Sequence, residues 1–452
     1  MRGVVCTRLE NVVYERGRRH LIIGAKNRPM YRKQSDWRDS FCRCIIPLIA
    51  IPLLLCIIGQ GLLRFLVSGA RTPPLSPIPS RLQLSFSQTT RINNMTTLYP
   101  GESLDTIAGF STIYHYQPAR AENARKRNPL IVCVPGGLHL ARVFYGGHPG
   151  SKTRDFVGHW LSENGYGVLS LSYPLETDPE IMPPTGARFR IRDWGRQAAA
   201  TTKKIIDEKN LGDPSIVLIS WSMGGRMVVP FNIAAKELGL HVQQYISFAA
   251  TPGFSTIRPP MPGLTCTDSG YFQVPPRLDN FERQLSEMDE LNGRTIIPRD
   301  IYRREYVGAT PINLIGLGLK YDGSGFVRDE IPHEEDSQVL NVANLPFITA
   351  LYPTSILDAS HAMTDRAGWG FLMTYSLESM IGKQGLRKAN ESSKWDALLN
   401  HVQSVPTKLC LPIRGNHFFF IGEQSARDTA GMVDRLIREA DDFQSELRSL
   451  IA

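Results

Sequence analysis

The chain has 452 residues, of which 42% are hydrophobic and 21% charged, a balance typical of a globular protein rather than a disordered or fibrous one. Its formal net charge is +8, but residues 1–43 hold eleven Lys or Arg against four Asp or Glu, which accounts for seven of those charges. Because the remainder is nearly neutral, the composition argues against a nucleic-acid groove, and we expect no nucleic-acid partner.

An apolar segment follows this basic tail. Residues 44–63 are twenty residues without a charge, which is enough to span a bilayer as a helix. A secretory signal would have a shorter apolar core, and a helix in a soluble protein would show a polar face. We therefore predict a basic cytosolic tail over 1–43 and an uncleaved transmembrane anchor over 44–66, which gives the protein a membrane as a partner.

The distribution of basic residues predicts the orientation of this anchor. Eleven of them precede the segment and only Arg64 and Arg71 follow closely, so the N-terminus is expected in the cytosol and the catalytic part in the lumen or outside the cell. The triplets that begin at Asn94 and Asn390 fit the acceptor pattern for N-glycosylation, which would be used in that location. Residues 67–104, which contain a Pro- and Ser-rich stretch, are predicted to form a linker.

Strand and helix signals alternate from about residue 108. The predicted outer antiparallel strand covers 110–116, and the predicted buried strands cover 129–134, 167–173, 215–221, 242–248, 345–352 and 408–413. The predicted helices cover 155–164, 191–210, 224–238 and 426–440. Strands that alternate with helices at this spacing form right-handed crossovers, so the expected fold class is α/β, with a mostly parallel sheet between helices.

One long stretch breaks this alternation. Residues 252–344 separate two predicted strands, and more than ninety residues are too many for a structureless connection in a compact domain. We predict a mostly helical insertion that covers the site. The whole domain is predicted to span 105–451.

The strand at 215–221 ends at a serine between small residues. Residues 220–224 read Ser-Trp-Ser-Met-Gly, with Ser220 in a position where the usual motif has glycine. A sharp strand-to-helix turn holds such a serine out of the packed layers, facing a base. Ser222 is therefore the candidate nucleophile.

The order of these signals resembles the α/β-hydrolase superfamily, over roughly residues 105–450. The resemblance lies in Pro135-Gly136-Gly137 after a strand, the turn at Ser222, a later acid, and Gly415-Asn416-His417-Phe418 after the last strand. It implies a serine nucleophile, an acid and a histidine in that order along the chain, with no cofactor.

The same resemblance implies the role of each residue. Ser222 would be the nucleophile and His417 the general base, with His401 a poorer fit because it falls in a predicted helix. The acid would be Asp358, six residues past the end of a strand, or alternatively Asp365. The oxyanion would be held by the amide of Met223 and by an amide at Gly137 or Leu138.

Metal binding is not expected. His139 and His148 stand apart from other ligand-type residues, and we expect them to face substrate or solvent. The predicted activity is hydrolysis of an ester, thioester or amide of a small lipophilic acyl substrate through an acyl-enzyme. The alternatives are an acyltransferase with the same three residues and a catalytically inactive binding protein of this fold.

Overall fold

A computed structural model describes residues 98–452 except 121, 123–128 and 255–261. The predicted tail, the anchor, Asn94 and all but the last residues of the predicted linker lie outside this part of the chain, and they stay predictions. Within the described ranges, no helix combines the length and the apolar character that crossing a bilayer requires.

A sheet of eight strands is the centre of the described part, in the order β1-β2-β4-β3-β5-β6-β12-β13. The two strands β1 and β2 run antiparallel to their neighbours, and the other strands are parallel to one another. The strands span Glu102–Ile107 (β1), Phe110–Gln117 (β2), Leu130–Val134 (β3), Gly167–Leu171 (β4), Ile216–Trp221 (β5), Val242–Phe248 (β6), Ile348–Pro353 (β12) and Cys410–Ile413 (β13). The predicted mostly parallel sheet is confirmed, and β1 begins three residues inside the predicted linker.

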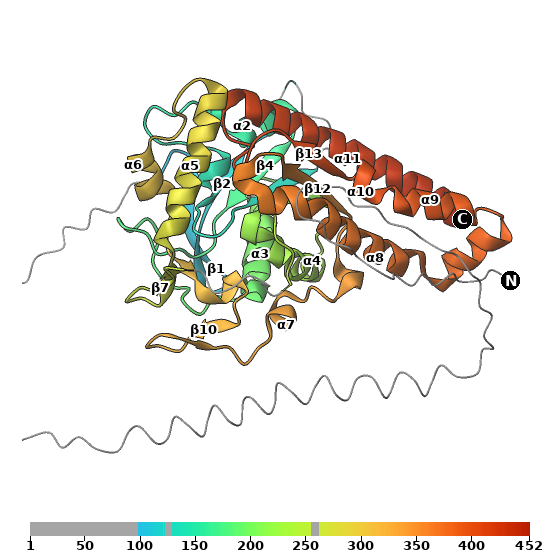
Figure 1. The fold of residues 1–452 in the computed structure, drawn as a ribbon, viewed down its shortest axis with the longest axis horizontal. Helices are drawn as coiled ribbons and strands as arrows, with labels where there is room; N and C mark the ends of the chain where they lie inside the picture. Colours follow the sequence, from blue (N-terminus) through green and yellow to red (C-terminus); the bar gives the residue numbers. More distant parts are fainter. Residues whose placement is uncertain (1–97, 121, 123–128, 255–261) are drawn as a thin grey trace, which may run out of the picture. The chain divides into compact units, whose positions relative to one another are not determined.

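Helices cover both faces of this sheet (Figure 1). One face carries α3 and α4, and the other carries α2 and part of α11. The helices span Val157–Glu163 (α2), Ile191–Glu208 (α3), Val228–Glu237 (α4), Ala359–Glu391 (α8), Trp395–Gln403 (α9), Val405–Lys408 (α10) and Glu423–Ile451 (α11). The terminal helix is therefore longer at both ends than the predicted 426–440.

The alternation of side chains along the central strands explains the two layers. Val132 on β3 and Leu218 on β5 belong to the apolar cluster beneath α3 and α4, while their neighbours Ile131 and Val217 belong to the cluster on the opposite face. Successive side chains of a strand point to opposite faces, so a strand that is apolar throughout must be covered on both sides. The central strands therefore require a layer of helices on each face of the sheet.

The insertion differs from the prediction. Its main helix is α5 (Pro275–Asn292), but the described part of 252–344 also holds a three-stranded sheet and a hairpin. Its strands are Thr265–Cys266 (β7), Tyr271–Gln273 (β8), Thr310–Pro311 (β9), Leu319–Tyr321 (β10) and Phe326–Arg328 (β11), and its short helices are Arg299–Ile301 (α6) and His333–Ser337 (α7). Helical residues outnumber strand residues in this part, but the prediction missed the strands, because two- and three-residue strands are too short to leave a periodic pattern.

Candidate active site

Ser222 lies at the carboxyl end of the central strand β5. Its φ is +55°, in the left-handed region that a residue with a side chain adopts at a cost of about 1 to 3 kcal/mol. Its carbonyl accepts a hydrogen bond from the Thr251 N–H at 2.8 Å, which ties the turn to the segment after β6. The backbone at Ser222 therefore has the strained geometry expected of a nucleophile turn.

Small residues around the turn are sterically required. A Cβ on Gly224 would lie 3.0 Å from the Pro135 carbonyl oxygen, and one on Gly225 would lie 2.6 Å from the Thr251 oxygen. Ser220, which replaces the usual glycine, is accommodated because its hydroxyl hydrogen-bonds the Tyr245 hydroxyl at 2.8 Å. The departure from the usual motif thus leaves the turn intact.

Gly136 has the closest approach to the serine. A Cβ there would meet the Ser222 Cβ at 2.5 Å and its Oγ at 3.1 Å. We expect Gly136→Ala to displace the serine and to lower kcat/KM by about 100-fold, the usual scale for a displacement near 1 Å at a reacting group. Gly431→Ala, on α11 with nothing within 4 Å of the added Cβ, is the matched control. A folded Gly136→Ala variant with the wild-type kcat/KM would contradict this steric reading.

His417 follows β13, and its partner is Asp358. The distance from His417 Nδ1 to Asp358 Oδ2 is 2.8 Å, and both side chains are buried. Asp358 precedes α8, whereas Asp365 lies inside that helix and contacts His361 instead. Of the two predicted acids, the structure therefore pairs Asp358 with the histidine. His401 lies on α9, where its Nε2 lies 3.0 Å from the Phe443 carbonyl oxygen.

The His417 ring is enclosed by aromatic side chains. It stacks on Phe281 at an interplanar angle of 12°, and its centroid lies 4.9 Å from that of Trp221. The Trp221 indole N–H donates to the His417 carbonyl at 2.8 Å, which joins the histidine loop to the residue directly before Ser222. Among the described residues, the buried Nε2 of His417 has no hydrogen-bond partner. The nitrogen that a general base would use is therefore available.

Burial lowers the pKa of His417 below its usual value of 6.5, although the charge of Asp358 and its hydrogen bond act in the opposite direction. Burial by itself would raise the pKa of Asp358, but His417 and, more weakly, His361 and Arg277 outweigh it and lower that pKa. The pair therefore consists of a neutral imidazole beside a carboxylate near neutral pH, which is the protonation state of a general base and its acid.

Helix α5 of the insertion fixes both loops of this pair. The Asn416 side-chain amide donates to the Gln284 carbonyl at 2.7 Å, and the Gln284 side-chain amide donates to the Leu357 carbonyl at 2.9 Å. Each bond ends on a neighbour of a site residue, Asn416 beside His417 and Leu357 beside Asp358. The insertion thus positions the base and the acid, a role that no sequence motif signalled.

The candidate oxyanion donors occupy two adjoining segments. Met223 follows the serine, and a Cβ on Gly137 would lie 3.2 Å from the Met223 sulfur, so the loop after β3 lies against the turn. The Leu138 N–H donates to the Thr310 Oγ1 at 2.9 Å. Because this amide is already engaged, Gly137 rather than Leu138 is the donor that the arrangement favours.

Two histidines are not where the sequence analysis expected them. His139 and His148 are both buried, with no more than 3% of their surface exposed, so the expectation that they face solvent or substrate was wrong. His139 Nε2 lies 2.7 Å from the Tyr302 hydroxyl, and burial lowers its pKa to about 3. The insertion supplies Tyr302 and so encloses a residue that looks isolated in the sequence.

One polar pair near the site was missed. His361, one helical turn after Asp358, contacts Asp365, and its ring centroid lies 5.0 Å from that of His417. Asp358, His361 and His417 each present a ligand-type atom, and these atoms lie within 4.8 Å of one another. An i, i+3 pair of Asp and His is a weak signal in a sequence, because the third member comes from a distant loop.

Asn390, the predicted glycosylation residue, lies exposed near the end of α8.

No protein-family model and no curated protein sequence matches the chain. Among solved structures it is similar to MenH from S. aureus, with 14% identity, a TM-score of 0.36, and coverage of 73% of this chain and 98% of that one. It is also similar to a monoglyceride lipase from Saccharomyces cerevisiae, with 10% identity, a TM-score of 0.38, and coverage of 77% and 96%. An esterase from Pyrobaculum calidifontis has 15% identity, a TM-score of 0.36, and coverage of 76% and 84%.

The fold is assigned from the topology of the chain itself. Six parallel strands follow two antiparallel ones, the central strand β5 ends in the strained serine, and the aspartate and histidine follow β12 and β13. Serine, aspartate and histidine occur in that order at the carboxyl edge of the sheet. By this topology the described part of the chain has an α/β-hydrolase-like fold.

Proposed function

We propose that the protein is a serine hydrolase that cleaves an ester, thioester or amide of a small lipophilic molecule. The observation that carries the proposal is the His417–Asp358 pair, with the His417 Nε2 buried and unpaired among the described residues, in a loop joined by Trp221 to the strained serine. An imidazole held through Nδ1 by a carboxylate is oriented to accept a proton at Nε2.

The proposed reaction has two halves. The Ser222 Oγ attacks the substrate carbonyl while its proton passes to His417 Nε2, and the imidazolium that forms is stabilised by Asp358. The N–H groups of Met223 and Gly137 are the proposed donors to the oxyanion. Collapse transfers the proton from His417 to the leaving group, and water activated by the same nitrogen then releases the acid.

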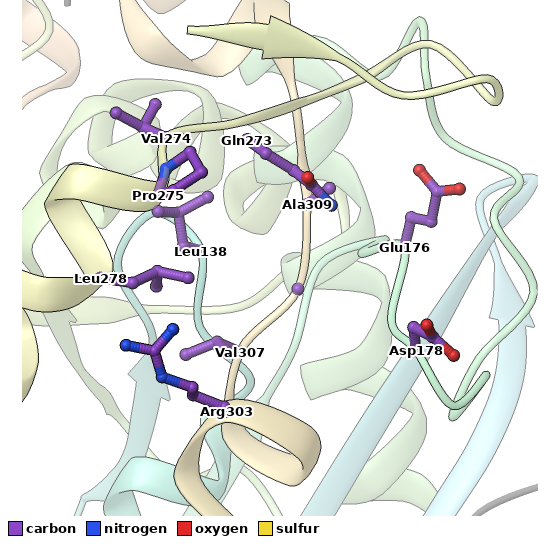
Figure 2. A pocket seen from close by; sticks show the side chains of 11 residues that line it. Leu138, Glu176, Asp178, Gln273, Val274, Pro275, Leu278, Arg303, Val307 and Ala309 are labelled. Carbon is purple, nitrogen blue, oxygen red and sulfur yellow. The ribbon is translucent and has the colours of Figure 1, made fainter. Parts of the chain in front are cut away.

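A cavity beside the oxyanion loop supports a lipophilic substrate. Its volume is about 170 Å³. It is lined in part by Leu138, the residue that follows the proposed donor Gly137. Figure 2 shows apolar side chains on one side, with Glu176 and Asp178 across from them and Arg303 at the lower edge. The apolar lining consists of Leu138, Val274, Pro275, Leu278, Val307 and Ala309. We propose that this cavity takes the apolar part of the substrate.

The test is turnover of a series of p-nitrophenyl esters of increasing chain length by the purified full-length protein. Release of free acid supports the hydrolase, transfer of the acyl group to an added alcohol in preference to water identifies an acyltransferase, and no turnover of any ester favours a binding protein. Each outcome is distinct because the product, rather than only the rate, is measured.

We expect the pH profile of kcat/KM to retain activity below pH 6.5. His417 must be neutral to accept the serine proton, and burial lowers its pKa from 6.5, so protonation inactivates the enzyme only at lower pH. The rate should then fall about tenfold per pH unit below that pKa. An acidic limb centred above pH 6.5 would show that another group, or a differently buried histidine, controls the rate.

A further inference from the structure

A second imidazole lies beside the proposed base. The His361 Nδ1 lies 2.9 Å and 3.1 Å from the two Asp365 oxygens, one helical turn away on α8. Asp358, His361 and Asp365 are spaced i, i+3 and i+7 in the chain, which places them on one face at the start of this helix. The proposed reaction uses Asp358 but neither of the other two.

We propose that Asp358, His361 and His417 form a binding site for a divalent cation of the Zn²⁺ class, and that a bound cation switches off Ser222. The three ligand-type atoms lie within 4.8 Å of one another. Two imidazoles and one carboxylate, with a fourth position for water, form a common ligand set for zinc. The binding part of this proposal stands independently, while the inhibition rests on the proposed function.

Asp365 is positioned to hold the ligand His361 without contacting the cation itself. A histidine that ligates a metal usually donates its other ring N–H to a carboxylate, which fixes the ring and its tautomer. Asp365 contacts His361 at Nδ1, so in a metal-bound state Nε2 would be the ligand atom of His361. This arrangement is the feature that distinguishes the cluster from three polar groups that happen to be close.

The geometry requires a small rearrangement of the three side chains. Ligand atoms around a tetrahedral zinc lie about 3.3 Å apart, as bond lengths of about 2.0 to 2.1 Å imply. The His417 Nδ1 and Asp358 Oδ2 atoms are 2.8 Å apart and would separate by about 0.5 Å, while the movement toward the ion falls on His361. Its side chain is 13% exposed, whereas that of His417 is 3% exposed, so His361 has the greater freedom to turn.

A route for the ion is present. A cavity of about 200 Å³ is lined by all three proposed ligands and by Arg277, Asn280 and Gln284 of α5. Arg277 and the N-terminal end of α8 oppose a cation there. The two carboxylates of Asp358 and Asp365 act in its favour and outnumber the single guanidinium, so the charges permit binding.

The chemical consequence follows from the imidazole tautomers. In the resting pair the neutral His417 carries its proton on Nδ1, and Nε2 accepts the serine proton. When the Nδ1 lone pair binds a cation, the proton of the neutral ring resides on Nε2, and no proton is gained or lost by the ring. A protonated Nε2 cannot accept a proton from Ser222, so the cation inhibits without any change of redox state.

The test uses Co²⁺ and Zn²⁺ with the purified full-length wild type and its His361→Gln variant. We expect one Co²⁺ per chain, with the visible absorption of a tetrahedral site, and loss of that absorption in His361→Gln. Zn²⁺ should slow labelling of the wild type by a fluorophosphonate at least tenfold, a chelator should restore the rate, and the ratio of rates with and without Zn²⁺ should return to one in His361→Gln.

His159→Gln is the matched control, because His159 and Glu163 form a comparable i, i+4 pair on α2. It should keep both the Co²⁺ absorption and the inhibition. No Co²⁺ binding by the wild type, or equal binding by His361→Gln, would overturn the site. If the wild type binds Co²⁺ but is never labelled, the proposed function fails while the site stands.

Discussion

Replacing Ser222 with alanine is expected to lower kcat for ester hydrolysis by about 10⁶-fold, the loss typical of removing the nucleophile of a serine enzyme. No other hydroxyl shares the position of Ser222 at the end of β5, where a φ of +55° turns it out of the sheet. KM should change little, because alanine removes the attacking atom and leaves the surrounding cavity intact. The measurement is steady-state kinetics of the full-length variant.

Ser220→Ala is the control for this substitution. Ser220 lies two residues earlier, and its hydroxyl contacts Tyr245 rather than the reacting groups. We expect a stability loss of about 1 kcal/mol from the broken hydrogen bond and near-normal turnover. A Ser222→Ala variant that is folded and still within tenfold of the wild type would remove the serine from the mechanism.

The second large effect is expected for Asp358→Asn, with a fall in kcat of about 10⁴-fold. The asparagine amide would donate to His417 Nδ1, and the imidazole proton would move to Nε2, the nitrogen that must accept the serine proton. The fold should survive, because the substitution keeps the shape of a side chain whose contact with Nδ1 is 2.8 Å. The loss should therefore appear in kcat.

Asp365→Asn separates the two predicted acids. Asp365 contacts His361 rather than His417, and burial raises its pKa. We expect a much smaller fall in kcat than for Asp358→Asn. If Asp365→Asn were the more damaging of the two, the acid would have been assigned to the wrong carboxylate.

The central strands could be predicted because burial on both faces leaves a clear pattern. β3 is apolar throughout, and β5 is buried throughout with Ser220 as its one polar residue, so their positions were visible within one or two residues. The turn at Ser222 was visible for the same reason, since its small neighbours are dictated by contacts along a short stretch of chain. Steric constraints of this kind act between residues that are close in the chain, so they can be recognised in a short stretch of sequence.

Other features depend on distant segments and could not be predicted. The burial of His139 comes from Tyr302, and the engagement of the Leu138 amide comes from Thr310, both in the insertion. The sequence named Asp358 and Asp365 as candidate partners of His417 but could not decide between them, because α8, α9 and α10 lie within the 59 positions that separate Asp358 from His417. No periodicity links such residues, and the two- and three-residue strands of the insertion leave too short a pattern to read.

Covalent labelling by a fluorophosphonate tests the central claim most directly, since it reports an activated serine whatever the natural substrate. The full-length wild type should gain the mass of one adduct, located on Ser222 by peptide mapping, and Ser222→Ala and His417→Ala should gain none. A folded wild-type protein that remains unlabelled, or an adduct that maps to another residue, would contradict the proposed mechanism.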